Sequence, residues 1–298
     1  MKSNYRYIVK AFMAMAVIAG TTSCDDFLDR EPMSSISPET YYSTAAQLEA
    51  NLNDEYPNVL PSFGQWTYGI FGEDKGTDNQ IEVNANDRYT QDRWKVPHSE
   101  SDNWKFERIY RINFFLSEAL PKFGEDMSGS QNTISGSVAT IKHYIGEMYF
   151  LRAYEYFKKL QLFGDFPIID QPLADEMEAL REASKRFPRN EVARFIISDL
   201  DKAYAYMSDV DMATTRINKD AAMLVKSRVA LFEATWLQNF KGTAFVPGGE
   251  GWPGASLHNN YQYPSGNLDN EVKYFLEQAV EASKLVADKY KGNLTENT

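Results

Sequence analysis

The sequence predicts an all-α protein, in which amphipathic helices stack as antiparallel hairpins and carry long, aromatic-rich loops. Apolar residues recur at the spacing of one helical face in several segments, and short connections separate these segments. No run of alternating apolar and polar residues is long enough for a substantial sheet. The two segments that lack a helical pattern are rich in Gly, Pro or Asn, as long surface loops are.

The clearest helix is predicted over residues 190–207, with Asn190 as its N-cap. One face carries apolar residues at i, i+3, i+4, i+8, i+11 and i+15: Val192, Phe195, Ile196, Leu200, Ala203 and Met207. Asp199 occupies position i+7 of the same face. An acidic residue among apolar neighbours predicts a buried ion pair, and we expect at least one of Arg152, Asp199 and Arg228 to be paired inside the core.

A second helix, over 218–236, repeats this template, with Asn218 as N-cap and Arg228 at the charged position. Its apolar positions are Ala221, Leu224, Val225, Val229, Phe232 and Trp236, and Trp236 is therefore expected in the core. Val192 and Ala221 lie 29 residues apart, near but not at the tetratricopeptide period of about 34 residues. A generic helical bundle fits this pattern as well as tetratricopeptide-like hairpins do.

The other helices are expected over 38–58, 104–120, 141–156 and 271–287. Ser37 before Pro38 is the expected start of the first of these, and Asp269 or Asn270 that of the last. The last helix repeats most of the template through Val272, Phe275, Leu276, Ala279, Val280 and Ala287. Gly164, Pro167 and Gly242 are predicted stops.

Residues 1–23 have the pattern of an export signal. Basic residues precede the apolar stretch Ala11–Gly20, which is too short to span a bilayer, and small polar residues follow it. Cys24 comes next, as in bacterial lipoprotein signals, so we expect Cys24 to be lipidated and residues 24–37 to form a tether. An ordinary secretory signal and a buried N-terminal helix are the alternatives. The helical domain is then predicted over 38–298.

Composition excludes several classes of protein. The net charge is −11 and the pI about 4.9, so the chain repels phosphate and we expect no nucleic-acid partner. One Cys and three scattered His leave no disulfide framework and no metal-ligand spacing. Nucleophile, P-loop and dinucleotide motifs are absent, and we predict neither catalysis nor a cofactor.

The two loops, 61–103 and 242–268, combine aromatic rings with hydrogen-bonding side chains. Sugars stack their apolar faces on such rings and bind neighbouring amides and carboxylates through their hydroxyls. We therefore predict a glycan-binding surface formed by Trp66, Asp78, Asn79, Tyr89, Trp94 and, more weakly, Trp252. Two alternatives remain open: the rings anchor the loops onto the helices, or acidic loop residues form a glycosidase pair.

Several motifs, taken in order, resemble the SusD-like (RagB/SusD) nutrient-uptake lipoproteins of Bacteroidetes. The strongest is GEMYFLRAYEYFKKLQLFGDFPII over 146–169, which holds Glu147, Arg152, Ala153, Tyr156, Phe157, Gly164, Asp165 and Pro167. The stretches 186–207 and 215–236 resemble the family's next helices; the second includes Arg216, Lys219, Ala221, Ala222 and Arg228. The Cys-Asp-Asp-Phe-Leu-Asp start at 24–29 also fits, as do Trp104, Ile109, Tyr110 and Asn113.

The resemblance implies a lipid-anchored, surface-exposed glycan-binding protein of the outer membrane without catalytic activity. Its expected partners are an oligosaccharide and a SusC-like TonB-dependent transporter, to which it would deliver the oligosaccharide. Family members usually continue for as much chain again, so by this resemblance residues 38–298 correspond to the family's N-terminal helical domain, and the family's C-terminal half is absent from this sequence. A tetratricopeptide-type scaffold that binds only protein and a surface glycosidase are the competing functions.

Overall fold

The structure is a computed structural model that describes residues 41–61, 80, 103–124, 126–208 and 212–292. The chain separates into two units, Met1–Tyr41 and Tyr42–Thr298, and the second contains the helices described below. Extended pairing in the described ranges consists of isolated bridges, such as those between Thr44 and Ser135 and between Phe166 and Phe187, and these ranges contain no longer strand. The all-α prediction is therefore confirmed.

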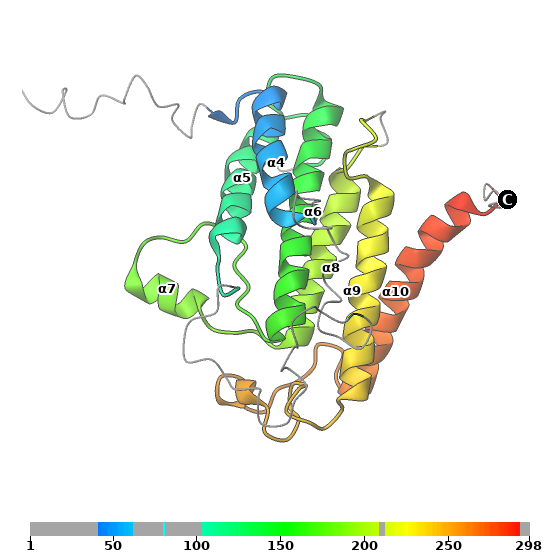
Figure 1. The fold of residues 1–298 in the computed structure, drawn as a ribbon. Helices are drawn as coiled ribbons and strands as arrows, with labels where there is room; N and C mark the ends of the chain where they lie inside the picture. Colours follow the sequence, from blue (N-terminus) through cyan, green and yellow to red (C-terminus); the bar gives the residue numbers. More distant parts are fainter. Residues whose placement is uncertain (1–40, 62–79, 81–102, 125, 209–211, 293–298) are drawn as a thin grey trace, which may run out of the picture. The chain divides into compact units, whose positions relative to one another are not determined.

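Figure 1 shows the long helices as an array in which α6, α8, α9 and α10 run side by side with alternating direction. In chain order the helices are α4 (Ala45–Val59), α5 (Glu107–Phe123), α6 (Val138–Phe163), α7 (Met177–Ala183), α8 (Arg189–Tyr206), α9 (Lys219–Asn239), the 3-10 helix η3 (Pro253–Ser256) and α10 (Leu268–Tyr290). Each of α8, α9 and α10 packs on the helix before it in the array. Stacked helix hairpins, as predicted, describe this order.

Helix α6 is the centre of the array because it is buried on nearly all sides. It contacts α4, α5 and α8, and its apolar residues surround the helix instead of forming one stripe. Gly146 lets α8 approach closely: a Cβ at this position would lie 2.8 Å from the backbone nitrogen of Met207. At the other end, Gly164 ends α6 with φ of 68°, a conformation that glycine adopts without steric cost.

The predicted face of the 190–207 helix is confirmed, because Val192, Ile196 and Leu200 are fully buried in α8 with Asp199 among them. The buried face predicted for the equivalent helix, α9, is wrong. Leu224 is 52% exposed and Arg228 is also exposed. The buried face of α9 is turned by about one residue and holds Ala222, Met223, Lys226, Val229, Ala230, Glu233, Ala234 and Leu237. In α10, Leu276 and Val280 of the predicted face are exposed as well.

One predicted helix cap is confirmed and two are wrong. The Asn218 side chain accepts a hydrogen bond from the backbone N–H of Ala221. Asn267, not Asp269 or Asn270, caps α10. Asn190 lies inside α8, which begins at Arg189, and the carboxylate of Asp165 accepts the backbone N–H of Arg189 at 2.9 Å in place of a local cap.

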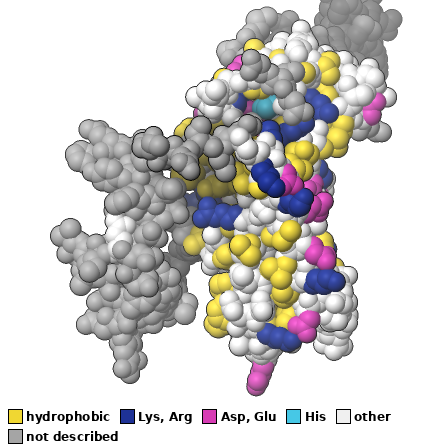
Figure 2. All heavy atoms as spheres, turned by 90° about the vertical axis from the view of Figure 1, so that its right-hand side faces the viewer, with side chains coloured by type: hydrophobic (Ala, Val, Ile, Leu, Met, Phe, Trp, Pro, Cys, Tyr) yellow, Lys and Arg dark blue, Asp and Glu magenta, His cyan; other side chains and the backbone are white. Residues whose placement is uncertain are grey.

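Buried ion pairs connect neighbouring helices, which confirms the prediction of a paired charge in the core. Arginines pair with carboxylates across helices, each pair with a largely or fully buried carboxylate: Arg152–Asp199, Arg189–Glu233, Arg194–Glu271 and Arg216–Glu147. Figure 2 shows the face toward which α10 lies, where basic and acidic side chains sit next to one another between hydrophobic ones. On α10 itself, Lys273 pairs with Glu277 and Lys284 with Asp288.

The export signal 1–23, the tether 24–37 with Cys24, and the Ser37 cap lie outside the described residues, so those expectations stay predictions. The continuous helix expected over 38–58 is wrong: residues 42–44 are not helical, and α4 begins at Ala45 with Thr44 as its N-cap. Among the described helices, none has the length and apolar character needed to cross a bilayer.

Candidate functional site

A pocket of about 730 Å³ lies where the end of α6 meets the loop between α9 and α10, residues 240–267. Other parts of its wall come from residues 181–189, which include the end of α7 and the start of α8, and from Trp236 of α9. In Figure 1 this loop lies at the bottom of the array, below the ends of α6 and α9. The volume is within the range of pockets that bind small ligands.

Aromatic rings form the apolar part of this pocket. Phe245 is 60% exposed, and Trp236 is partly exposed on α9. Trp236 is held in place on two sides: its indole N–H donates to the carbonyl of Phe245 at 3.0 Å, and the Arg189 guanidinium lies 4.1 Å from its ring centre. The Trp236 ring is therefore positioned before any ligand binds, which lowers the entropic cost of stacking on it.

Trp252 anchors the loop to the helices. Its ring is only 5% exposed, and its indole N–H donates to Oδ2 of Asp165 at 2.7 Å. Asp165 thus joins the loop to α6 and α8, because its other oxygen accepts the backbone N–H of Arg189. Burial raises the pKa of Asp165, and these two hydrogen bonds oppose the increase.

A glycine permits the tight path of the loop beside these rings. A Cβ at position 249 would lie 1.9 Å from the carbonyl oxygen of Thr243, so only Gly249 fits there. Farther along, the Tyr263 hydroxyl donates to the carbonyl of Pro247 at 2.6 Å, and His258 Nε2 lies 2.7 Å from the carbonyl oxygen of Arg186. The loop is consequently an ordered wall of the pocket, held in place by hydrogen bonds at several positions.

The rim of the pocket is polar and basic. Arg181, Lys185 and Arg186 line it together with Gln161, and all three basic residues are exposed. Asp165 is the one acidic residue among the described lining residues. Rings beside amide and guanidinium donors are the combination that a sugar ligand uses.

The structure brings together only part of the predicted binding surface. Trp66, Asp78, Asn79, Tyr89 and Trp94 lie outside the described residues, and their role stays a prediction. Trp252 is in the pocket wall, but its burial matches the anchoring alternative better than an open stacking surface. Two rings missed by the sequence analysis, Trp236 and Phe245, take the exposed positions.

The expectation that Trp236 is a core residue is wrong. Its position on the helical template pointed inward, but the true buried face of α9 is displaced from that template. Phe245 sits between Gly242 and Gly248, so its place in an irregular segment was the one signal by which the sequence could have identified it.

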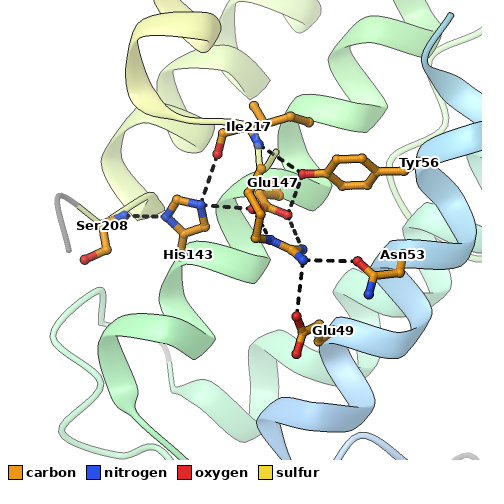
Figure 3. A network of polar contacts seen from close by, with 8 residues as sticks. Glu49, Asn53, Tyr56, His143, Glu147, Ser208 and Ile217 are labelled. Carbon is orange, nitrogen blue, oxygen red and sulfur yellow. Dashed lines mark hydrogen bonds and ion pairs between the residues drawn. The ribbon is translucent and has the colours of Figure 1, made fainter. Parts of the chain in front are cut away.

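A second polar cluster, centred on Glu147 of α6, has the residue types of a catalytic site. Arg216 donates to both carboxylate oxygens at 2.8 and 2.6 Å, and the Tyr56 hydroxyl donates to Oε2 at 2.9 Å. His143 Nε2 lies 2.9 Å from Oε1. Figure 3 shows these side chains converging from α4, α6 and the segment before α9. Burial raises the pKa of Tyr56, and the negative charge of Glu147 raises it further.

The cluster has a structural role: its polar groups form hydrogen bonds and ion pairs with one another, and these contacts hold α4, α6 and the segment before α9 together. His143 Nδ1 accepts the backbone N–H of Ser208 at 3.1 Å, so Nε2 carries the proton that faces Glu147 and the carbonyl of Ile217. Arg216 extends the contacts to Asn53 and Glu49 on α4. Glu147 is 0% exposed, which leaves no access for a substrate. Glu147 and Arg216, two of the motif residues quoted above, thus have structural roles.

Comparison with known proteins identifies the family of this chain. Residues 26–231 match the family model of SusD-like proteins that carries the description "Starch-binding associating with outer membrane". The chain belongs to the SusD-like family. The resemblance drawn from the motifs is thereby confirmed.

SusD-like relatives differ from this chain in length. SusD-like protein P2 of Formosa agariphila is 25% identical over 81% of this chain and 46% of its own length, and SusD-like protein P25 of the same organism is 25% identical over 72% and 41%. The chain therefore spans less than half the length of these relatives. A SusD-like protein of Bacteroides fragilis has a similar fold, with a TM-score of 0.50, 21% identity and coverage of 71% of this chain and 39% of its own.

Proposed function

We propose that this SusD-like protein binds oligosaccharides without cleaving them and delivers them to a TonB-dependent transporter of the outer membrane. Family membership supports binding of a starch-like or other glycan, since the family description names starch binding and the outer membrane. The observation that carries the proposal for this chain is the pocket beside α6, where Phe245 and Trp236 expose ring surface next to hydrogen-bond donors.

The chemistry of the pocket favours binding over cleavage. Glycosidases use two carboxyl groups on either side of the scissile bond. The described lining of the pocket supplies one, Asp165, and both of its oxygens already accept hydrogen bonds from Trp252 and Arg189. Weak stacking contacts on a preformed wall suit a protein that must capture a glycan and then release it.

The position at the membrane rests on the N-terminal sequence. The proposed lipid on Cys24 would hold the protein on the outer membrane, and the acidic residues after it would form part of a solvated tether. A surface-exposed, lipid-anchored protein is placed to pass its ligand to a SusC-like transporter in the same membrane.

Two measurements with the same polysaccharides separate the proposed function from its competitors. The full chain is run through affinity gels that contain mixed polysaccharides, and it is also incubated with these polysaccharides in solution, which is then analysed for released sugars. Retardation without released sugars is the expected result. Released sugars would establish a glycosidase, and migration unaffected by every polysaccharide would favour a scaffold that binds only protein.

Delivery to a transporter needs its own experiment. We expect the lipoprotein, purified from detergent-solubilised outer membranes, to bring a TonB-dependent transporter with it. Absence of such a protein from the complex, under conditions where the lipoprotein still binds polysaccharide, would limit the proposed function to glycan capture.

A further inference from the structure

We infer that the pocket beside α6 prefers oligosaccharides that carry an anionic group, a carboxylate or a sulfate, over neutral ones. This inference rests on the proposed function and specifies the ligand class of the same pocket. It follows from the charge of the rim, which differs in sign from the charge of the whole chain. A protein with a net charge of −11 has here a wall that contains Arg181, Lys185, Arg186 and Arg189, and Asp165 is the one acidic residue among the described lining residues.

Not every one of these charges is available to a ligand. Arg189 is neutralised by buried Glu233, with Nη2 to Oε2 at 2.9 Å. Asp165 is turned inward to Trp252 and the backbone of Arg189, and at longer range its charge is shared between Arg189 and Arg186. The positive charge that faces solvent therefore comes from the remaining three basic residues.

Two of the three rim residues have weak, exchangeable partners. Lys185 pairs with Glu182 at 2.6 Å, and Arg181 lies 3.7 Å from Glu178. Both pairs are exposed and join residues three positions apart on the same short segment. Exposed pairs of this kind contribute little to stability, so an anionic ligand competes with them at low cost.

Arg186 is the residue on which the preference depends most. Within the described ranges, no carboxylate lies within ion-pair distance of its guanidinium, which instead lies 4.6 Å from the ring centre of Trp104. Its backbone carbonyl accepts the ring N–H of His258, so both ends of the residue are held. A held, unpaired guanidinium offers a planar pair of donors that matches a carboxylate or a sulfate.

Stacking and charge therefore meet in one pocket. A sugar ring on Phe245 or Trp236 would be bound within a wall that also contains Arg186, so the anionic substituent and the pyranose face are recognised together. A neutral glycan would use only the rings and the amide of Gln161. We expect an anionic oligosaccharide to bind at least about tenfold more tightly, as one charge-assisted hydrogen bond allows.

The test compares ligands that differ in charge alone. Short oligogalacturonate and its fully methyl-esterified form share the same ring skeleton, and a chondroitin sulfate oligosaccharide supplies sulfate as well as carboxylate. Maltooligosaccharide serves as the neutral reference. Each is titrated into the full chain and into the Arg186→Gln variant by calorimetry, with Lys273→Gln on exposed α10 as the matched control.

We expect the free acid to bind more tightly than its ester, Arg186→Gln to remove that difference, and Lys273→Gln to keep it. Rising salt should weaken binding of the acid and leave that of the ester unchanged, since charges at an exposed rim are screened. Tighter binding of chondroitin sulfate than of its chemically desulfated form would show that the pocket also recognises sulfate, and equal binding of the two would assign the preference to carboxylate.

Equal affinity for acid and ester overturns the inference, and so does an acid preference that survives in Arg186→Gln. Binding of maltooligosaccharide or another neutral glycan alone also overturns it, but leaves the proposed function intact. Failure of every glycan to bind, anionic or neutral, overturns the proposed function and this inference together. Circular dichroism of each variant shows whether the fold is retained.

Discussion

Arg152 and Asp199 form a two-pronged ion pair between α6 and α8, with Nε 2.6 Å from Oδ2 and Nη2 2.8 Å from Oδ1. The remaining guanidinium nitrogen donates to Asn113 on α5 and to the carbonyl of Asp170, both at 2.9 Å. One arginine therefore fixes three helices and the chain that follows α6. Asp199 is 0% exposed, and the Lys202 ammonium lies 3.7 Å from its Oδ1 as a second, longer ion-pair contact.

Replacing Arg152 with Met should lower the free energy of unfolding by about 3–5 kcal/mol, because it leaves the buried Asp199 carboxylate with only the longer contact to Lys202 at 3.7 Å. Urea denaturation of the full chain measures the change. Arg228→Met is the matched control: Arg228 is exposed on α9, and the expected change is within about 0.5 kcal/mol. Equal stability of parent and Arg152→Met would show that this ion pair contributes nothing net.

Glu271 makes the fold sensitive to acid. Burial alone would raise its pKa, but hydrogen bonds from Arg194, Asn190 and Ser265 outweigh burial and hold the pKa below its ordinary value of 4.5. A carboxylate with a lowered pKa stabilises the fold above its unfolded pKa, and that contribution is lost as the pH falls through the folded pKa. Stability from Glu271 is thus present at pH 7 and disappears in the acid range below about 4.5.

The Glu271→Gln variant should therefore be less stable than the parent at neutral pH, and the difference should shrink as the pH is lowered below 4.5. Chemical denaturation at a series of pH values gives both curves, and taking their difference removes the other titrating groups. If the difference in unfolding free energy between parent and variant stays constant from pH 7 to pH 3, Glu271 has the same pKa in the folded and the unfolded protein, which would contradict this account.

Trp252 should hold the α9–α10 loop against the helices through its hydrogen bond to Asp165. Trp252→Phe keeps a ring but removes the donor, and we expect a loss of about 1–3 kcal/mol together with faster proteolysis within residues 240–267. Limited proteolysis with mass spectrometry reports both the rate and the site. Tyr290→Phe removes an exposed hydrogen bond to Asp220 and serves as the control; if both variants are cleaved alike, the Trp252 contact does not hold the loop.

Cys24 provides the predicted membrane attachment. We expect Cys24→Ala to move the protein from the membrane fraction to the soluble fraction with an unchanged circular dichroism spectrum, since two or three acyl chains give durable attachment. Fractionation of cells that express either form makes the comparison. Ser23→Ala, next to the same cleavage zone, should remain in the membrane, and a variant without Cys24 that also remains there would contradict lipidation.

The helical spacing of apolar residues predicted most of the helices, and buried charged residues explain why the predicted buried face of α9 was wrong. In α8 a single acidic residue interrupts an otherwise apolar stripe, so the buried face was found with Asp199 on it. In α9, Lys226 and Glu233 occupy the buried face and pair with Asp201 and Arg189 from other elements. Charged residues count against burial in any periodic pattern, and this drew the predicted face toward exposed Leu224.

The candidate pocket was harder to predict because its wall joins residues far apart in the chain. The sequence could identify the 242–268 segment as irregular and aromatic, and this segment lines part of the candidate pocket. The 61–103 segment, on which the predicted surface mainly depends, lies almost wholly outside the described residues. Which ring is exposed depends on distant partners: Asp165 draws Trp252 inward from 87 residues away. Trp236 stays partly exposed because Arg189 and the loop cover only part of its ring.

The affinity of one ring variant tests glycan binding in this pocket most directly. Phe245→Ala removes a 60% exposed ring with little consequence for the core. With an oligosaccharide that the full chain binds, calorimetry should show a loss of roughly 10- to 100-fold, by analogy with about 1–3 kcal/mol per stacked base. Tyr290→Ala, an exposed ring on α10, should bind like the parent. Unchanged affinity in a folded Phe245→Ala protein would contradict a stacking role for this pocket.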